Sequence, residues 1–193
     1  GTRNIEIVNG ALDAPDTEND NLAIGYDALG GSIAGGEYNV ALGNYVLDAN
    51  TSGDNNIGLG YNSLTANTTG SVNVAIGSQA LDANTTGGSN VAVGYSALGA
   101  NVSSNYNTGI GRQALSNTTG AANTSLGYRA GDIITSGSSN VIIGVNADPS
   151  ADAAANQIVI GQGATGHGDN IAVIGNGSNT AIHPHDDNEV DLG

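Results

Sequence analysis

The residues best suited to metal chemistry form the triplet His183-Pro184-His185 near the C-terminus. On an extended backbone, side chains two positions apart point to the same side, so the two imidazoles face one direction. In a three-fold trimer, three copies meeting on the axis would supply six nitrogen ligands, an octahedral set that suits iron or nickel better than tetrahedral zinc. The alternative is that Asp186 and Asp187 hold solvated imidazoles. The triplet thus predicts an axial metal ion at His183 and His185.

Four tyrosines make the second candidate site because each directly follows a recurring glycine; they are Tyr26, Tyr61, Tyr95 and Tyr128. If the recurring segments stack, the four fall in one column, which is interrupted by Asn44, Ser78, Arg112 and Val145. An exposed aromatic column can bind sugars or another protein. Packing at the bend, or between chains, is the structural alternative.

No group of residues has the pattern of a catalytic site. Acidic residues gather at 13–20 and 186–191, but charge runs are typical of solvated segments, and paired glycosidase carboxylates need a concave cleft. The glycine-rich stretch 30–36 lacks the lysine and helix of a phosphate-binding loop. We expect no enzymatic activity and no catalytic residue.

The charge balance excludes two classes of partner. The 193 residues carry 3 Lys+Arg against 18 Asp+Glu, a net charge of −15. Binding to phosphates needs clustered cations, and the only ones here are Arg3, Arg112 and Arg129, so we expect neither nucleic acid nor an anionic membrane as a partner. No apolar run approaches the roughly 18 residues of a membrane span, so membrane insertion is not expected.

The remaining composition excludes an ordinary thick core. Glycine occurs 31 times, while Cys, Met, Trp and Phe are absent, so disulfides, thiol chemistry and a core of large side chains are all ruled out. A pentapeptide of the type Asn-x-Ala-Ile-Gly recurs instead. Its final glycines are Gly25, Gly43, Gly60, Gly77, Gly94, Gly111, Gly127, Gly144, Gly161 and Gly175. Their spacing is about 17 residues, which is too short for a repeat built from a pair of helices.

This repeat predicts an all-β fold, a parallel β-solenoid or β-roll of about ten such coils. Each coil should contain a strand, a glycine bend, a second strand such as YDAL or SQAL, and a turn such as DANTTG at 82–87. We expect a repeat domain at 21–175, an entry strand with an acidic loop at 1–20, and a tip or linker at 176–193.

The first strand has one face of small residues. Side-chain alternation separates Val74 and Ile76 from Ala75. We expect the larger pair to face the core and the small column to lie outside, where it allows a partner subunit to approach closely. The alternative is that small residues keep a flat sheet unstrained. The small column comprises Ala23, Ala41, Gly58, Ala75, Ala92, Gly109 and Ser125.

An asparagine opens most of these strands, from Asn21 to Asn140. Stacked coils would bring the amides of this column together, so we expect a ladder of hydrogen-bonded side chains.

The repeats NNIGLGYNSLTANTTGSVNVAIGSQALDANTTG at 55–87 resemble the heads of trimeric autotransporter adhesins, and more closely the Asn-Thr-Ala-Ile-Gly-Tyr-x-Ala-Leu arrays of phage tail fibres and virion spikes. The resemblance covers roughly positions 21 to 175. It implies a left-handed roll and a homotrimer, and phage fibres also carry His-x-His metal sites. Adhesin heads have a shorter coil, so the long turn here departs from that family.

The C-terminal AIHPHDDNEVDLG at 181–193 resembles the segment that precedes the endosialidase-type intramolecular chaperone of phage tail proteins. In that family a serine-containing junction follows, where the trimeric chaperone cleaves itself off. The resemblance implies an autoproteolytically matured chain that ends at Gly193, although a boundary cut by design would look identical.

Together these features predict a non-enzymatic structural and receptor-binding part of a trimeric tail fibre, located on the virion tail or otherwise extracellular. Its expected partners are two further copies, other tail-fibre subunits and a host-surface polysaccharide or protein. A bacterial trimeric adhesin head is the alternative, to be distinguished by a downstream coiled coil and membrane anchor. Ice binding by the threonine pairs in the turns is a third hypothesis, and thermal hysteresis would test it.

Overall fold

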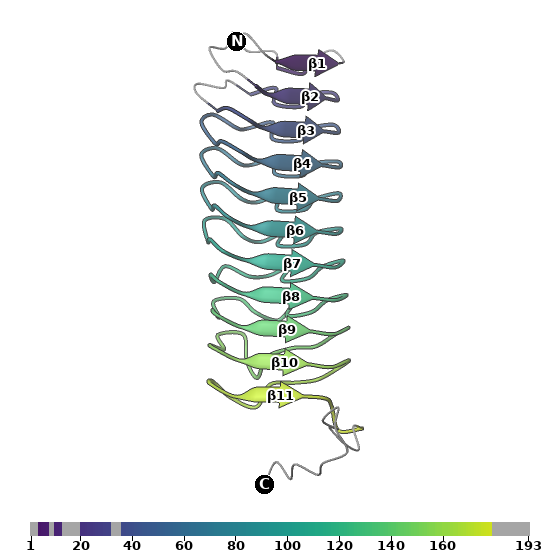
Figure 1. Ribbon diagram of the computed structural model, residues 1–193, viewed down its shortest axis with the longest axis vertical. Coiled ribbons are helices and arrows are strands. Elements are labelled where there is room, and N and C mark those ends of the chain that lie inside the picture. The colour runs from purple at the N-terminus through teal and green to yellow at the C-terminus, as the bar shows by residue number, and fades with distance from the viewer. Residues whose placement is uncertain (1–3, 8–9, 13–19, 32–35, 179–193) are drawn as a thin grey trace, which may run out of the picture.

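The computed structural model of the chain is a parallel β-solenoid, as the repeat predicts (Figure 1). It describes residues 4–7, 10–12, 20–31 and 36–178. Eleven three-residue strands form one sheet in sequence order: β1 (Ile5–Ile7), β2 (Leu22–Ile24), β3 (Val40–Leu42), β4 (Ile57–Leu59), β5 (Val74–Ile76), β6 (Val91–Val93), β7 (Thr108–Ile110), β8 (Thr124–Leu126), β9 (Val141–Ile143), β10 (Ile158–Ile160) and β11 (Ala172–Ile174). From β2 to β11 the chain makes about nine turns, and the described residues include no helix.

The strand register reproduces the sequence repeat. In the middle of the sheet, Ala75 pairs with Ala92, the equivalent residue of the next coil. Where the interval is longer, Ala23 still pairs with Ala41, and where it is shorter, Val159 pairs with Val173. Extra or missing residues are therefore absorbed by the turns, while the strands stay aligned.

Each coil contains a single strand, so the expectation of two strands per coil was wrong. The segment after the glycine is a tight turn, because its second and fourth residues have left-handed backbone angles, as in Tyr45 (φ 59°) and Leu47 (φ 53°). Such residues interrupt an extended backbone. The segment still bonds to its neighbours: the Gln79 amide donates to the Tyr61 carbonyl at 2.8 Å.

The column of small residues lies inside the solenoid, which corrects our assignment of the two strand faces. Ala75 and Ala92 have no exposed surface, whereas Val74 and Ile76 are partly exposed. Beside the buried leucines of the turns, the coil leaves room only for a small residue on the inner face. A methyl group added at Gly58, for example, would collide with the Val46 side chain of the preceding coil. In β9 and β10, where the following turns carry no leucine, the inner residues are instead Ile142 and Val159.

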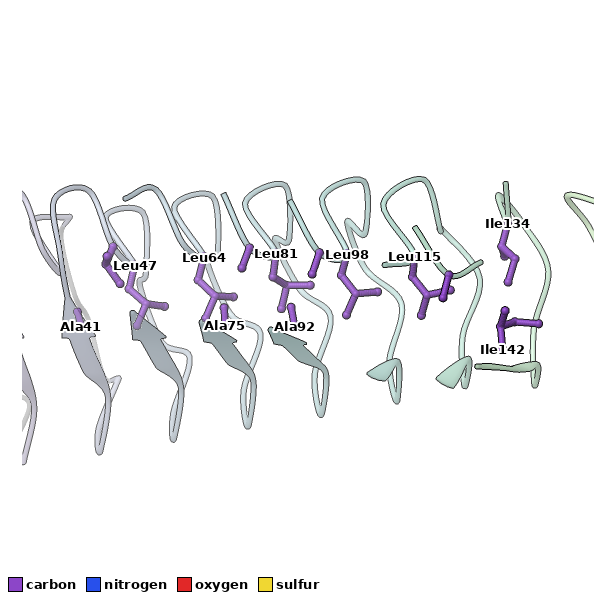
Figure 2. Close-up of a cluster of buried hydrophobic side chains, with 14 of the residues drawn as sticks. Ala41, Leu47, Leu64, Ala75, Leu81, Ala92, Leu98, Leu115, Ile134 and Ile142 are labelled. Carbon is purple, nitrogen blue, oxygen red and sulfur yellow. The ribbon is translucent and has the colours of Figure 1, made fainter. Parts of the chain in front are cut away.

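The opposite wall of the core is a column of leucines from the turn that follows each glycine (Figure 2). All are fully buried and face the small residues of the strands; they include Leu47, Leu64, Leu81, Leu98 and Leu115. From β2 to β7 the core is therefore one leucine and one small residue thick. Burial of each leucine stabilises the fold by roughly 1.5–3 kcal/mol before the entropy of ordering is subtracted.

The predicted asparagine ladder is confirmed. Asn90 donates from its backbone amide and its side-chain Nδ2 to Asn73 Oδ1, at 3.0 and 3.1 Å, and Nδ2 also reaches the Ser104 carbonyl at 2.9 Å. Asn73 bonds to Asn56 in the same way. These amides are fully buried, so the ladder satisfies polar groups at the start of the strands from β2 to β9.

A second ladder in the turns was not predicted from the sequence. It runs through Asn50, Asn67, Asn84 and Asn101, with side-chain amides 2.8–3.1 Å apart. It stops at Asn101, whose Oδ1 is buried and unpartnered, because the next coil is shorter and has Thr118 at this position.

Candidate functional site

The four tyrosines lie at the bend that follows each strand, on the surface of the solenoid. Tyr26, Tyr61, Tyr95 and Tyr128 are 47, 52, 46 and 38% exposed, so none is a core residue. Hydrogen bonds between coils hold their backbone: the Tyr95 carbonyl accepts from the Gln113 amide at 2.8 Å. The fold thus presents the column on a rigid support.

The first part of the column is a cluster of three aromatic rings. Tyr45 packs edge-on between Tyr26 and Tyr61, with ring centroids 5.5 and 5.9 Å apart and interplanar angles of 81° and 87°. A shallow hollow beside it is lined by Tyr45, Tyr61, Asn62 and Thr65. Desolvation, together with neighbouring Tyr26 and Asp27, raises the pKa of the Tyr45 phenol.

Sequence reasoning missed Tyr45 because it stands one residue later than the others, after Asn44 rather than directly after Gly43. The Asn44-Tyr45 pair could have indicated it, because this coil has no tyrosine directly after its glycine. In the structure the Asn44 side chain accepts a hydrogen bond from the Tyr26 amide at 3.0 Å, so Asn44 serves as a backbone support.

The second part of the column alternates aromatic and cationic residues. The Arg112 guanidinium carbon lies 5.7 Å from the ring centroids of both Tyr95 and Tyr128. The nearby Arg129 is instead bonded to Asp132 at 2.5 Å, and this carboxylate raises the pKa of the Arg129 guanidinium. Arg112, which interrupts the tyrosine pattern in the sequence, is therefore part of the aromatic column.

Three carboxylates of the described residues have a raised pKa, and they lie on different coils. Desolvation raises the pKa of Asp48, Asp82 and Asp148. Among the residues that the structure describes, no three His, Cys, Asp or Glu side chains gather as metal ligands would. His183, His185 and Gly193 lie outside the described residues, so the axial iron or nickel ion and the maturation end remain predictions.

Threonine hydroxyls of the turns bond to the adjacent coil. Thr68 Oγ1 donates to the Thr85 carbonyl at 2.9 Å, and Thr51 and Thr119 make the same contact with their following coils. These hydroxyls therefore stabilise the stack. Ice binding stays a hypothesis for thermal hysteresis to test.

The outer face of the sheet is apolar over its whole length. From β2 to β11 no strand residue is charged, and the outward positions are mainly Val, Ile and Leu. Many remain well exposed, including Leu42 (39%), Leu126 (49%) and Ile174 (55%). Ten strands at about 4.8 Å give an apolar stripe on the order of 45 Å long. A stripe of this size is typical of an interaction surface.

The part of the chain that the structure describes holds no helix able to cross a membrane. No family model, no curated protein and no solved structure matches this chain. The functional interpretation therefore rests on the surfaces described above.

Proposed function

We propose that this chain is a non-enzymatic, structural and receptor-binding segment of a homotrimeric phage tail fibre or virion spike, which attaches to a host-surface polysaccharide or protein. The observation that carries the proposal is the uncharged, half-exposed sheet face from β2 to β11. Covering the exposed Val, Ile and Leu side chains of this face with a partner would gain about 25 cal/mol for each Å² of apolar surface removed from water.

Copies of the same chain are the partner that fits this face best. Each copy offers an apolar stripe of the same length and strand spacing, so parallel copies can match it along the whole rod. Each chain has a net charge of −15, so two copies repel each other when they approach through their charged surfaces. The sheet face from β2 to β11 carries no charge and avoids this repulsion. The resemblance of residues 55–87 to tail-fibre repeats supports three copies.

Hydrogen bonding between coils makes the chain suitable as a rod. Three parts of each coil form backbone hydrogen bonds to the next coil: the strand, the turn after the glycine, and the Asn-Thr turn that precedes the next strand. Examples are Val74–Asn90, Leu64–Ala80 and Thr68–Thr85. Backbone polar groups are therefore paired with the next coil at several points around the circumference, which suits a rigid rod.

The tyrosine column supplies the receptor contact in this proposal. Exposed tyrosines offer apolar ring surface and a hydroxyl group at little cost in side-chain entropy, which suits sugar and protein recognition. The column sits at the bend rather than on the sheet face, so it stays accessible when the sheet faces are covered. Virion-tail or extracellular localisation and contact with other fibre subunits belong to the same proposal.

Binding to intact bacterial cells and to immobilised bacterial polysaccharides tests the receptor role. The double variant Tyr26→Ala, Tyr61→Ala should lose at least tenfold in affinity, because it removes the aromatic cluster around Tyr45. Tyr106→Ala is the control, since Tyr106 is 68% exposed but lies outside the column. Equal binding by wild type and the double variant would contradict the assignment of the column, and cleavage of the polysaccharide would contradict a non-enzymatic role.

A further inference from the structure

The acidic residues of this chain avoid one stretch of the solenoid. No Asp or Glu occurs between Asp82 and Asp132, although the whole chain holds 18. This acid-free segment, residues 83–131, contains β6, β7 and β8 and two of the three cations, Arg112 and Arg129. An anionic ligand is repelled by most of a rod with net charge −15, but far less along these coils.

Within the acid-free segment, Arg112 is the cation available to a ligand. Arg129 is bonded to Asp132, whereas the contacts of the Arg112 side chain in the described part of the chain are with the rings of Tyr95 and Tyr128. Arg112 is exposed, so its N–H donors are accessible. A ring on either side limits the guanidinium's rotamer freedom, which reduces the entropy lost when a ligand binds.

We propose that Tyr95, Arg112 and Tyr128 form a binding site for the carboxylate of an acidic sugar, such as a hexuronic or sialic acid, within a surface polysaccharide. A guanidinium donates two parallel hydrogen bonds to a carboxylate, and these charge-assisted bonds are about twice as strong as neutral ones. The inference rests on the proposed receptor role and names the chemical class that this part of the column recognises.

The surroundings of Arg112 favour a sugar over an acidic peptide. The two tyrosines sit two coils apart, about 9.6 Å along the rod, and can offer a hydroxyl group on each side of the bound carboxylate. Ser96 and Gln113 follow Tyr95 and Arg112 directly and are partly exposed, so polar side chains able to hydrogen-bond to a sugar adjoin the site. Acidic peptides are typically recognised by a cluster of arginines, whereas in this segment Arg112 stands alone and Arg129 is bonded to Asp132.

The test is affinity electrophoresis of the whole chain in gels containing polygalacturonate, polysialic acid or neutral dextran. We expect at least one acidic polymer to retard the wild type. Arg112→Gln should weaken that binding tenfold or more, and Arg112→Lys should restore it in part, since a lysine keeps the charge without the bidentate fork. Arg129→Gln also removes one positive charge, and it should change the affinity for the acidic polymer less than threefold. Unchanged thermal melting checks that each variant folds.

The outcomes separate this inference from the receptor role. If the wild type binds cells or dextran but neither acidic polymer, or if Arg112→Gln binds as the wild type does, the carboxylate site is overturned and the receptor role stands. If no cell or polysaccharide binds, both fail. If polyglutamate competes as well as polygalacturonate does, the assignment to sugars is overturned.

Discussion

Gly94 occupies a position in the coil that no other residue type can fill without strain. Its φ is +128°, and a Cβ atom there would lie 2.6 Å from the carbonyl group of Gly111 in the next coil. Every coil from β2 to β10 places a glycine at this bend, because adjacent coils are in direct backbone contact. The recurring glycine thus allows adjacent coils to approach to the spacing of hydrogen-bonded strands.

We expect Gly94→Ala to lower the free energy of unfolding by about 3 kcal/mol, the sum of backbone strain and overpacking. Gly99→Ala is the matched control, because its added methyl group would meet its nearest atom at an ordinary 3.4 Å. Denaturant unfolding, followed by circular dichroism, measures the free energy of unfolding of both variants. Equal losses in the two variants would contradict the close contact at the bend.

Asp148 is a partly buried carboxylate with one oxygen, Oδ1, that has no hydrogen-bond partner. Desolvation and the nearby Asp132 raise the pKa of Asp148 above its ordinary value of 3.8 in the folded chain. The folded state therefore holds this proton more tightly than the unfolded state does. The resulting stabilisation is complete below pH 3.8 and is lost as the pH rises through the raised pKa.

Asp148→Asn should consequently raise Tm at pH 7 and have little effect near pH 3, where the wild type is already protonated. Asp169→Asn should act in the opposite direction. The Ala155 amide and the Gln157 side chain lower the pKa of Asp169, so its charge stabilises the fold above pH 3.8 and is lost as the pH falls through the lowered pKa. Thermal melts at the two pH values test both signs. A Tm gain for Asp148→Asn that is the same at both would contradict the account.

At the scale of the element, a ladder of asparagines opens the strands from β2 to β9. Asn73 accepts two hydrogen bonds from Asn90 and donates to Asn56 Oδ1 and to the Gly87 carbonyl, at 3.2 and 2.8 Å. All of these asparagines are buried, so removing one amide leaves several polar atoms without partners.

We expect Asn73→Ala to cost about 3 kcal/mol, since each buried polar group left unpaired costs about 1–3 kcal/mol. Asn117→Ala should cost less than about 1 kcal/mol, because Asn117 is exposed and donates a single hydrogen bond, to the Asp132 carbonyl. Urea unfolding curves compare the two. A loss at Asn73 no larger than that at Asn117 would mean that the ladder contributes little.

The repeat predicted the parallel strands, their register and the asparagine ladder, since all three follow from a glycine and an asparagine that recur at a nearly constant interval. It did not predict the turn after the glycine, because residues such as Leu47 and Tyr45 rarely adopt left-handed angles and give no sign of doing so. That error reversed the two strand faces. With a leucine wall opposite the sheet, only small residues fit inside.

The constant interval of the repeat also made the candidate site predictable in part. Stacked coils align the tyrosines that follow each glycine, which the sequence shows directly. The contacts of Tyr45 and Arg112 depend on which side chains reach across neighbouring coils, and the spacing of the repeat does not contain that information.

At the scale of the whole molecule, we expect the apolar sheet face to determine the oligomeric state. Ile76→Glu with Val93→Glu adds two charges to that face, and these side chains do not belong to the buried core. We expect this variant to remain folded but to lose self-association. Val102→Glu with Val72→Glu adds the same charge at exposed positions outside the strands and should leave association intact. Light scattering on a sizing column, with circular dichroism as the check on folding, compares the two. Dissociation by the turn variant alone would place the interface elsewhere.

The most direct test of the account is the mass of the wild-type chain in solution, measured by light scattering on a sizing column. One chain has a mass of 18.9 kDa. We expect a single species with three times that mass, in which three apolar sheet faces are covered. A species with the mass of one chain, stable at micromolar concentration, would contradict it and leave a monomeric solenoid with an open apolar face.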